Sequence, residues 1–169
     1  SMGIKKLYAV GTRNEQRSLL SGIVKSTFCN CREETPVDFI MKQTGGKGVD
    51  LAFECVGVKE SIDSVIGSTA AGGQVVFVGN PAGDIEFDKQ VYWNILRRQL
   101  VMHGTWNSSF TKDINDDWHR AIKAIQEGAI RPSAQITHRY PLEMLKEGLK
   151  VMRDKAVFTN KVMIGKDTV

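Results

Sequence analysis

The chain has 169 residues, of which 41% are hydrophobic and 25% are charged, and its formal net charge at pH 7 is +4. These values are typical of one globular domain, and no apolar run is long enough to span a bilayer, so we expect a cytoplasmic protein without a membrane partner. The positive charges are spread along the chain instead of gathered in a stripe, which argues against nucleic acid as a partner.

The first predicted element is a buried strand over residues 4–10, and Gly11-Thr12-Arg13-Asn14 follows it at once. The second strand of a nucleotide-binding βαβ unit usually ends in this way, at the point where the protein contacts the ribose of the cofactor. The glycine-rich phosphate turn of such a unit lies about 20 residues further upstream, and this sequence has no room for it. We therefore expect a domain that lacks its first strand, its phosphate turn and its first helix.

Apolar runs of strand length alternate with helical patterns along the rest of the chain, which predicts parallel strands joined by helical crossovers. Further strands are expected at residues 26–29, 51–54, 75–78, 100–103 and 161–164. Helices are expected at residues 15–23 and 92–98, from Pro36 to Gly45-Gly46, around Ile62 and Ile66 up to Ala71-Gly72-Gly73, around Trp118 and Ile125 up to Gly128, and along the stripe of Leu142, Leu145, Leu149 and Met152. The fold class is therefore α/β, a Rossmann-like doubly wound parallel sheet.

The clearest strand of the chain is the aliphatic run at residues 75–78. Nearly continuous aliphatic side chains are typical of a parallel strand that helices cover on both faces. We therefore expect this strand at the centre of the sheet.

Candidate ligand contacts lie at the carboxyl ends of the strands, because open α/β sheets bind ligands there. At the first end, Arg13 offers a planar fork of donors beside the Thr12 hydroxyl, and no carboxylate is present to repel a phosphate. This pattern indicates a site for the 2′-phosphate of NADP(H) in preference to NAD(H). An exposed arginine that begins a helix is the alternative.

Three further strand ends are Glu54-Cys55-Val56-Gly57, Val78-Gly79-Asn80 and His103-Gly104-Thr105-Trp106. A glycine just past a buried strand lets the backbone approach a flat ligand closely, but it also starts an ordinary turn. Trp106 either lies near a planar ring or is a tryptophan of the core or of an interface.

The remaining polar residues form no catalytic constellation and no metal site. His103, His119 and His138 lack the spacing that a metal needs, and no serine lies in a G-x-S-x-G motif. We expect His119 on a helix surface, His138 in a loop, and the cluster of Asp113, Asp116 and Asp117 as the cap of a helix. The three cysteines are expected to be reduced, structural thiols, at Cys29, Cys31 and Cys55.

Taken together, the order of these motifs along the chain resembles that of the medium-chain, zinc-dependent alcohol and polyol dehydrogenases. The resemblance spans nearly the whole chain, and residues 95–107 and 136–142 are most similar to sorbitol and galactitol-1-phosphate 5-dehydrogenases. The matching stretches are Tyr8-Ala9-Val10-Gly11-Thr12-Arg13, Gly45-Gly46-Lys47-Gly48-Val49-Asp50, Phe53-Glu54-Cys55-Val56-Gly57, Gly72-Gly73-Gln74-Val75-Val76-Phe77-Val78-Gly79 and Ile95-Leu96-Arg97-Arg98-Gln99-Leu100.

This resemblance implies a hydride transfer between a polyol or polyol phosphate and NADP, or NAD. It places residues 1–135 in a partial dinucleotide-binding domain and residues 136–169 in a C-terminal segment that packs on a catalytic domain. The residues implied at the cofactor are Gly11, Thr12 and Arg13 at the adenosine ribose, Cys55, Val56, Gly57, Val78, Gly79 and Asn80 along the groove, Gly104, Thr105 and Trp106 near the nicotinamide carboxamide, and Lys161 at a cofactor phosphate.

The family holds its catalytic zinc with ligands that precede the cofactor domain, so the resemblance implies that zinc belongs to the parent enzyme only. It places no catalytic residue and no metal ligand in this chain, which we expect to be inactive alone. The missing strand would be the central one of the sheet, so its loss predicts open edges and association of the chain with copies of itself. A non-enzymatic Rossmann-like module for nucleotide sensing or self-association is the alternative function.

Overall fold

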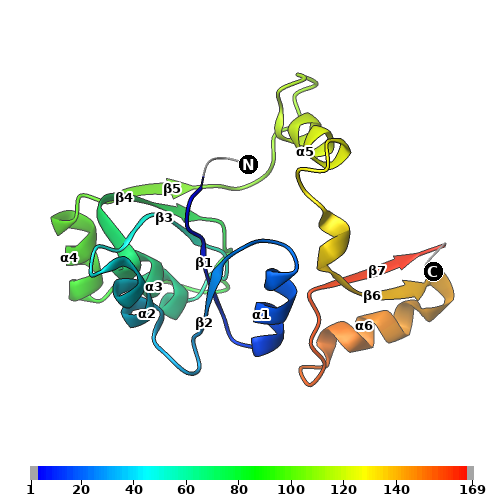
Figure 1. Cartoon of the computed structure of the whole chain (residues 1–169), viewed down its shortest axis with the longest axis horizontal. Coiled ribbons are helices and arrows are strands. Elements are labelled where there is room, and N and C mark those ends of the chain that lie inside the picture. The colour runs from blue at the N-terminus through cyan, green and yellow to red at the C-terminus, as the bar shows by residue number, and fades with distance from the viewer. Residues whose placement is uncertain (1–3, 167–169) are drawn as a thin grey trace. The chain divides into compact units, whose positions relative to one another are not determined.

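The computed structural model describes residues 4–166 as an α/β fold (Figure 1). Its strands are β1 (Tyr8–Gly11), β2 (Thr27–Asn30), β3 (Val49–Glu54), β4 (Thr69–Phe77), β5 (Val101–Gly104), β6 (Ile136–Pro141) and β7 (Lys161–Gly165). Its helices are α1 (Asn14–Ser21), α2 (Pro36–Thr44), α3 (Lys59–Ser68), α4 (Lys89–Arg97), α5 (Asp117–Gln126) and α6 (Leu145–Arg153), with two short 3₁₀ turns, η1 (Pro132–Gln135) and η2 (Leu142–Met144). None of the described helices is long and apolar enough to cross a membrane.

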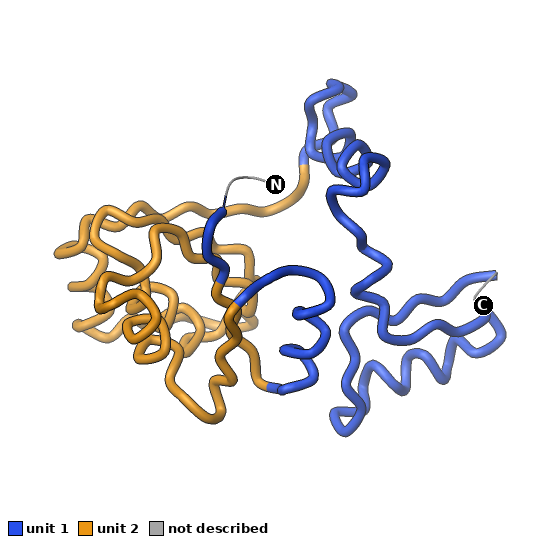
Figure 2. The backbone as a smooth tube through the Cα atoms, viewed as in Figure 1, with its two compact units in different colours: residues 1–7, 13–26, 109–169 blue, residues 8–12, 27–108 orange. Residues whose placement is uncertain are grey.

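The chain divides into two compact units (Figure 2). Unit 2 contains residues 8–12 and 27–108, and so holds β1 to β5 with helices α2 to α4. Unit 1 contains α1 and everything from residue 109 onward.

All strand pairs among the described residues are parallel, as the alternation of strands and helices predicts. They form three separate sheets, in the orders β1-β2, β3-β4-β5 and β6-β7. Within the described part of the chain, β1 and β3 therefore each have a strand partner on one side only. The sheet is interrupted at the place where the sequence predicts a missing central strand.

Helices α3 and α4 bury one face of the three-stranded sheet. The core of unit 2 is formed by Ile62 and Ile66 of α3 together with Val75 of β4 and Leu100, and both Ile66 and Val75 are fully buried. A smaller core joins Cys29 of β2 to α2. These contacts fix the crossovers that order the strands.

The opposite face of this sheet is open, which corrects the prediction that helices cover both faces. β4 is central, as expected. On the side away from α3, however, Leu51, Phe53 and Val101 are 43%, 55% and 46% exposed. Residues that pair across parallel strands point to the same face, so Leu51 and Val101 share this face with the exposed Gln74 of β4 between them.

Three local predictions are also wrong. Strand β1 begins only at Tyr8, and the apolar side chains of Ile4 and Leu7 are exposed. Helix α3 ends at Ser68, before the predicted glycine turn, because Thr69 already pairs with Val49 in the sheet. His138 lies in strand β6, which the sequence analysis missed, and not in a loop.

Helix α2 agrees with its sequence signals at both ends. The Thr35 hydroxyl accepts a hydrogen bond from the backbone N–H of Asp38, and Pro36 occupies the first turn. Gly45 ends the helix with a left-handed backbone at φ 62°, which a residue with a side chain rarely adopts.

Arg98 stabilises the change from helix α3 to strand β4. Its guanidinium donates hydrogen bonds of 2.8 Å and 2.9 Å to the carbonyls of Gly67 and Thr69. Its own carbonyl accepts from the N–H of Gly72 at 2.7 Å. One side chain therefore satisfies two backbone acceptors that the end of a helix leaves without partners.

The loop before α5 is closed by Asp116, as the predicted cap requires. The Asp116 carboxylate accepts hydrogen bonds from the backbone N–H groups of His119 and Thr111 and lies 2.8 Å from His119 Nδ1. The backbone hydrogen bond from His119 is the main cause that lowers the pKa of Asp116 to about 2. His119 itself lies on α5 with a partly exposed side chain, which confirms its predicted place on a helix surface.

Replacing Arg98 should destabilise unit 2. Arg98→Met leaves the carbonyls of Gly67 and Thr69 without their donor, and we expect a loss of about 2 kcal/mol in the free energy of unfolding, measured by urea denaturation. Arg97→Met is the matched control, because Arg97 is exposed and stacks on Trp93. Equal losses in the two variants would contradict this role of Arg98.

Acid should open the loop before α5. Because folding lowers the pKa of Asp116 from 3.8 to about 2, its stabilising effect is complete above pH 3.8 and is lost as the pH falls toward 2. Near-ultraviolet circular dichroism reports the change through Trp118, which packs edge-on against Phe110 of the same loop. Asp117 binds Ser109 of the same loop and its pKa is also lowered, first by the backbone hydrogen bond from Ser109, so we expect Asp116→Asn to weaken this acid transition and Asp113→Asn to keep it. A transition of unchanged size in Asp116→Asn would refute the assignment.

Candidate functional site

The ends of three strands lie side by side at one edge of the sheet of unit 2. Glu54 pairs with Phe77, and Phe77 pairs with Gly104, in parallel strands. The loops that follow these residues therefore leave the sheet from the same edge. These loops hold the site residues that the sequence predicts after β3, β4 and β5, which are Cys55, Val56, Gly57, Val78, Gly79, Asn80, Thr105 and Trp106.

The loop after β3 folds around the carboxylate of Glu54, whose residue is 1% exposed. Its Oε1 accepts hydrogen bonds from the N–H of Val56 at 2.8 Å, the N–H of Gly57 at 2.9 Å and the hydroxyl of Ser61 at 2.6 Å. Residue 61 lies in the first turn of α3, so the carboxylate joins the end of β3 to the start of the next helix.

The surroundings of Glu54 favour its ionised form. Burial alone would raise the pKa of this carboxyl, but hydrogen bonds from the Ser61 hydroxyl and from the backbone of Gly57, Val56 and Gly79 outweigh burial, and the pKa lies below 4.5. Next to it, burial and the charge of Glu54 raise the pKa of the Cys55 thiol. Cys55 is therefore a protonated thiol at neutral pH and is not activated as a nucleophile.

Two glycines let the loops after β3 and β4 touch. A Cβ atom on Gly57, which has φ +81°, would lie 2.6 Å from the backbone carbon of Asn80. A Cβ on Gly79 would lie 2.5 Å from Glu54 Oε2 and 2.6 Å from the backbone nitrogen of Val56. Real Cβ atoms do not approach other atoms so closely, so neither position has room for a side chain.

Each of the three loops has an exposed apolar side chain, beside the exposed polar residues Asn80 and Thr105 and the exposed Cys55. Val56, Val78 and Trp106 are 65%, 49% and 78% exposed, one from each loop. For Trp106 this exposure excludes the alternative of a core tryptophan. The N–H of Thr105 donates to the carbonyl of Phe77 at 3.0 Å, which fixes the start of the last loop, and the space beside Gly104 is open.

At the end of β1, the carbonyl of Gly11 accepts a hydrogen bond of 2.8 Å from the N–H of Cys31 after β2. Arg13 begins helix α1, where its N–H donates to Gln16 Oε1 at 3.0 Å. Its guanidinium donates to the backbone carbonyl of Lys155. Gly11 and Thr12 belong to unit 2, and Arg13 belongs to unit 1.

The last predicted site residue, Lys161, is the first residue of β7 in unit 1. Its side chain is exposed, and its backbone carbonyl accepts a hydrogen bond from the Thr137 hydroxyl at 3.2 Å. It lies in a different unit from the loops after β3, β4 and β5.

Sequence reasoning missed two residues that shape this edge, Glu54 and Ser61. The available signal was a carboxylate at the end of an apolar strand with a glycine three residues later, Glu54-Cys55-Val56-Gly57. That pattern predicts a turn, but it does not show that the carboxylate accepts the hydrogen bonds that hold the turn together.

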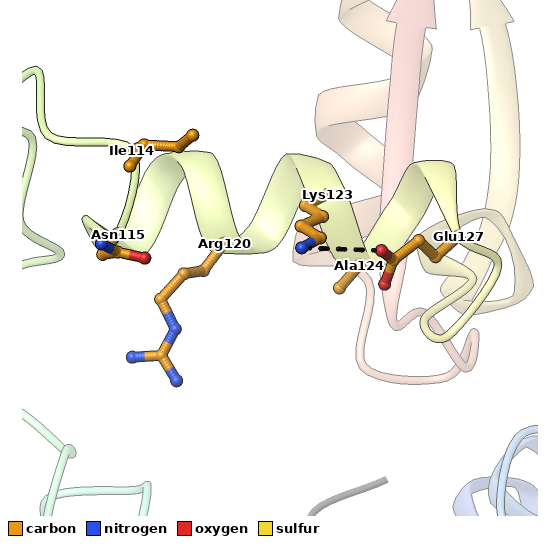
Figure 3. Close-up of a pocket in the computed structure, with 6 residues that line it drawn as sticks. All are labelled: Ile114, Asn115, Arg120, Lys123, Ala124 and Glu127. Carbon is orange, nitrogen blue, oxygen red and sulfur yellow. Dashed lines mark ion pairs between the residues drawn. The ribbon is translucent and has the colours of Figure 1, made fainter.

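A hollow elsewhere, along α5 in unit 1, contains none of the predicted site residues. Figure 3 shows its side chains along the helix, with an ion pair of 3.8 Å between Lys123 and Glu127. Nowhere between residues 4 and 166 do three or more His, Cys, Asp or Glu side chains gather in a way that could hold a metal ion.

The chain was compared with known protein families and structures. A family model described as zinc-binding dehydrogenase matches residues 1–127. The chain is 29% identical over 135 residues to L-arabinitol 4-dehydrogenase of Aureobasidium melanogenum, and the match covers 78% of this chain and 34% of that protein. The chain thus spans about a third of the length of this relative.

Solved structures show the same fold. Galactitol-1-phosphate dehydrogenase from Escherichia coli aligns with a TM-score of 0.81 at 20% identity, over 95% of this chain and 46% of that chain. A zinc-binding dehydrogenase from Sinorhizobium meliloti bound to NADP aligns with a TM-score of 0.79 at 23% identity, over 96% and 45% of the two chains. Together with the family match over three quarters of its length, these results confirm the predicted fold class, and the chain belongs to the zinc-binding dehydrogenase family.

Proposed function

We propose that this chain is the cofactor-binding part of a dehydrogenase that transfers hydride between a polyol or polyol phosphate and NADP, with NAD as the alternative cofactor. The observation that carries this proposal is the common edge of β3, β4 and β5, where the three loops that follow these strands present Val56, Val78 and Trp106. Exposed apolar side chains on adjacent loops suit a flat ring that binds at the strand ends. The names of the similar arabinitol and galactitol-1-phosphate dehydrogenases support a polyol as the substrate class.

The residues of the chain would bind and orient the cofactor rather than react with it. Cys55, Val56, Gly57, Val78, Gly79 and Asn80 would line the groove, Gly104, Thr105 and Trp106 would lie near the nicotinamide, and Gly11, Thr12, Arg13 and Lys161 would contact the adenosine ribose and the phosphates. The bound cofactor supplies the hydride chemistry. The described residues offer no metal-binding cluster, so we assign zinc to the rest of the parent enzyme, derive no step through it, and expect the chain alone to be inactive.

The region from residue 136 onward would pack on the catalytic domain, while residues 1–135 form the partial dinucleotide-binding domain. Strands β6 and β7 pack closely on Gly148 of α6, where a Cβ atom would lie 3.1 Å from Cδ1 of Ile164. This region also has an exposed apolar stripe, at Leu142, Leu145, Leu149 and Met152. A continuous exposed apolar stripe is typical of a surface that another domain covers.

We also propose that copies of the chain associate through the open sheet edges. The supporting observation is that β1 and β3 each lack a strand partner on one side within the described residues. Unpaired N–H and C=O groups of such edges pair readily with another chain. A cytoplasmic location stays a prediction.

Arg13 should set the preference between the cofactors. Arg13→Ala removes a guanidinium that would bind the 2′-phosphate, and we expect the affinity for NADPH to fall on the order of tenfold to a hundredfold, with little change for NADH. Quenching of tryptophan fluorescence and calorimetry measure both affinities. Arg131→Ala removes the same charge from an exposed position as the control. An unchanged preference, or tighter NADH binding by the unaltered chain, contradicts the phosphate assignment.

Association should be visible as a mass above 18.8 kDa in light scattering that rises with protein concentration. Val10→Lys places a charge on the half-exposed surface of β1 and should shift the equilibrium toward monomer. Val24→Lys, in the loop after α1, is the control and should associate like the unaltered chain. A monodisperse monomer at all concentrations rules out the association.

A further inference from the structure

The carboxylate of Glu54 lies where three parts of unit 2 meet. It ends strand β3, it accepts from the Ser61 hydroxyl at the start of α3, and its Oε2 faces the backbone of Gly79 after β4. The backbone carbonyl of the same residue accepts from the N–H groups of Val78 at 2.8 Å and Gly79 at 3.0 Å. One residue therefore contacts both the loop after β3 and the loop after β4.

The loops around this carboxylate are closely packed. Gly57 and Gly79 lie so close to the opposite loop that neither has room for a Cβ atom. Any shift of the carboxylate would therefore move the backbone of one loop against the other.

The two oxygens of the Glu54 carboxylate differ in their hydrogen bonding. Oε1 accepts three hydrogen bonds, whereas the buried Oε2 has no donor in good hydrogen-bond geometry among the described residues, although the nearby backbone of Gly79 still lowers the pKa of the carboxyl. An uncompensated buried acceptor costs free energy, and an apolar side chain would avoid that cost. The presence of a carboxylate is explained if its charge and its three donors are needed to hold the loops.

We propose that Glu54 is a positioning residue whose carboxylate holds the loops at residues 55–57 and 78–80 at one fixed separation. Its use for a cofactor rests on the proposed function, in which both loops line the groove. The fixed separation itself is a property of unit 2 and is testable without a cofactor.

The charge of Glu54 gives the test a signature that packing alone does not. Because folding lowers the pKa of Glu54 below 4.5, ionisation stabilises the loops above this pH, and that stability is lost as the pH falls through the lower folded value. No charged side chain contributes to this shift, and the neighbouring Cys55 thiol stays protonated throughout the acid range. The amides of both loops should therefore titrate together, with one midpoint.

Nuclear magnetic resonance of the whole chain measures this midpoint and the exchange of loop amides with solvent. In Glu54→Gln the shared titration should disappear, and exchange at Val56 and Gly57 should accelerate on the order of tenfold or more, since bonds to a charged acceptor are lost. Glu86→Gln is the matched control, because Glu86 is an exposed carboxylate of the same unit. A response of Val56 and Gly57 without any response of Gly79 would overturn the proposal.

Ser61→Ala keeps the carboxylate and removes one donor, so it decides the matter if Glu54→Gln does not fold. Loss of the hydroxyl hydrogen bond should move the midpoint of both loops upward toward 4.5. A midpoint equal to that of the unaltered chain would overturn the proposal.

Titration of the same proteins with NADPH separates this inference from the proposed function. A fall in NADPH affinity on the order of tenfold in Glu54→Gln, with no fall in Glu86→Gln, would support both the positioning role of Glu54 and the proposed function. If the unaltered chain does not bind NADPH, the proposed function fails, while a shared titration of the two loops still supports the fixed separation. Equal NADPH affinity in Glu54→Gln, with loops shown to be loosened, would overturn the role of Glu54 in positioning the groove.

Discussion

Strand β4 pairs with β3 on one side and with β5 on the other. This pairing brings the loops that follow the three strands, which hold the candidate site of unit 2, to the same edge of the sheet. Parallel neighbours require crossovers, and α3 and α4 supply them by burying Ile66 and Val75 completely in one face of the sheet. The three strand ends then share an edge because of their register. The core behind the loops fixes where each one starts, whereas the close packing at Gly57 and Gly79 restricts which residues the first two loops can hold.

The strand ends were predictable from the sequence, and some strand starts were not. Apolar runs followed by glycine-containing turns predicted ends at residues 54, 78 and 103, each within one residue of the observed ends at Glu54, Phe77 and Gly104. The start of β4 was missed because Thr69 enters the sheet through its pairing with Val49, twenty residues away, which no local pattern shows. Strand β6 was missed for the same reason, because its partner β7 begins only at Lys161.

In the candidate site, too, local sequence patterns were predictive, whereas contacts between residues farther apart in the sequence were not predicted. Glycine beside an apolar strand end correctly indicated close backbone approach at Gly57 and Gly79. The reason for that approach lies in the side chain of Glu54, whose hydrogen bonds run to residues two, three and seven positions later. Such a pattern depends on the exact turn after β3, so the residue types alone could not assign it.

Apolar surface stays exposed where the helices do not cover the sheet. Helices α3 and α4 cover one face of the β3-β4-β5 sheet, while Leu51, Phe53 and Val101 on the other face keep about half of their surface exposed. Exposed apolar area on this scale costs free energy in water and is typical of surfaces that bind something. The loops at the strand ends do not need a partner on the exposed face, because the helices on the covered face already hold their strands in register. A chain of this kind can therefore form the geometry of its strand-end site before its remaining surfaces find a partner.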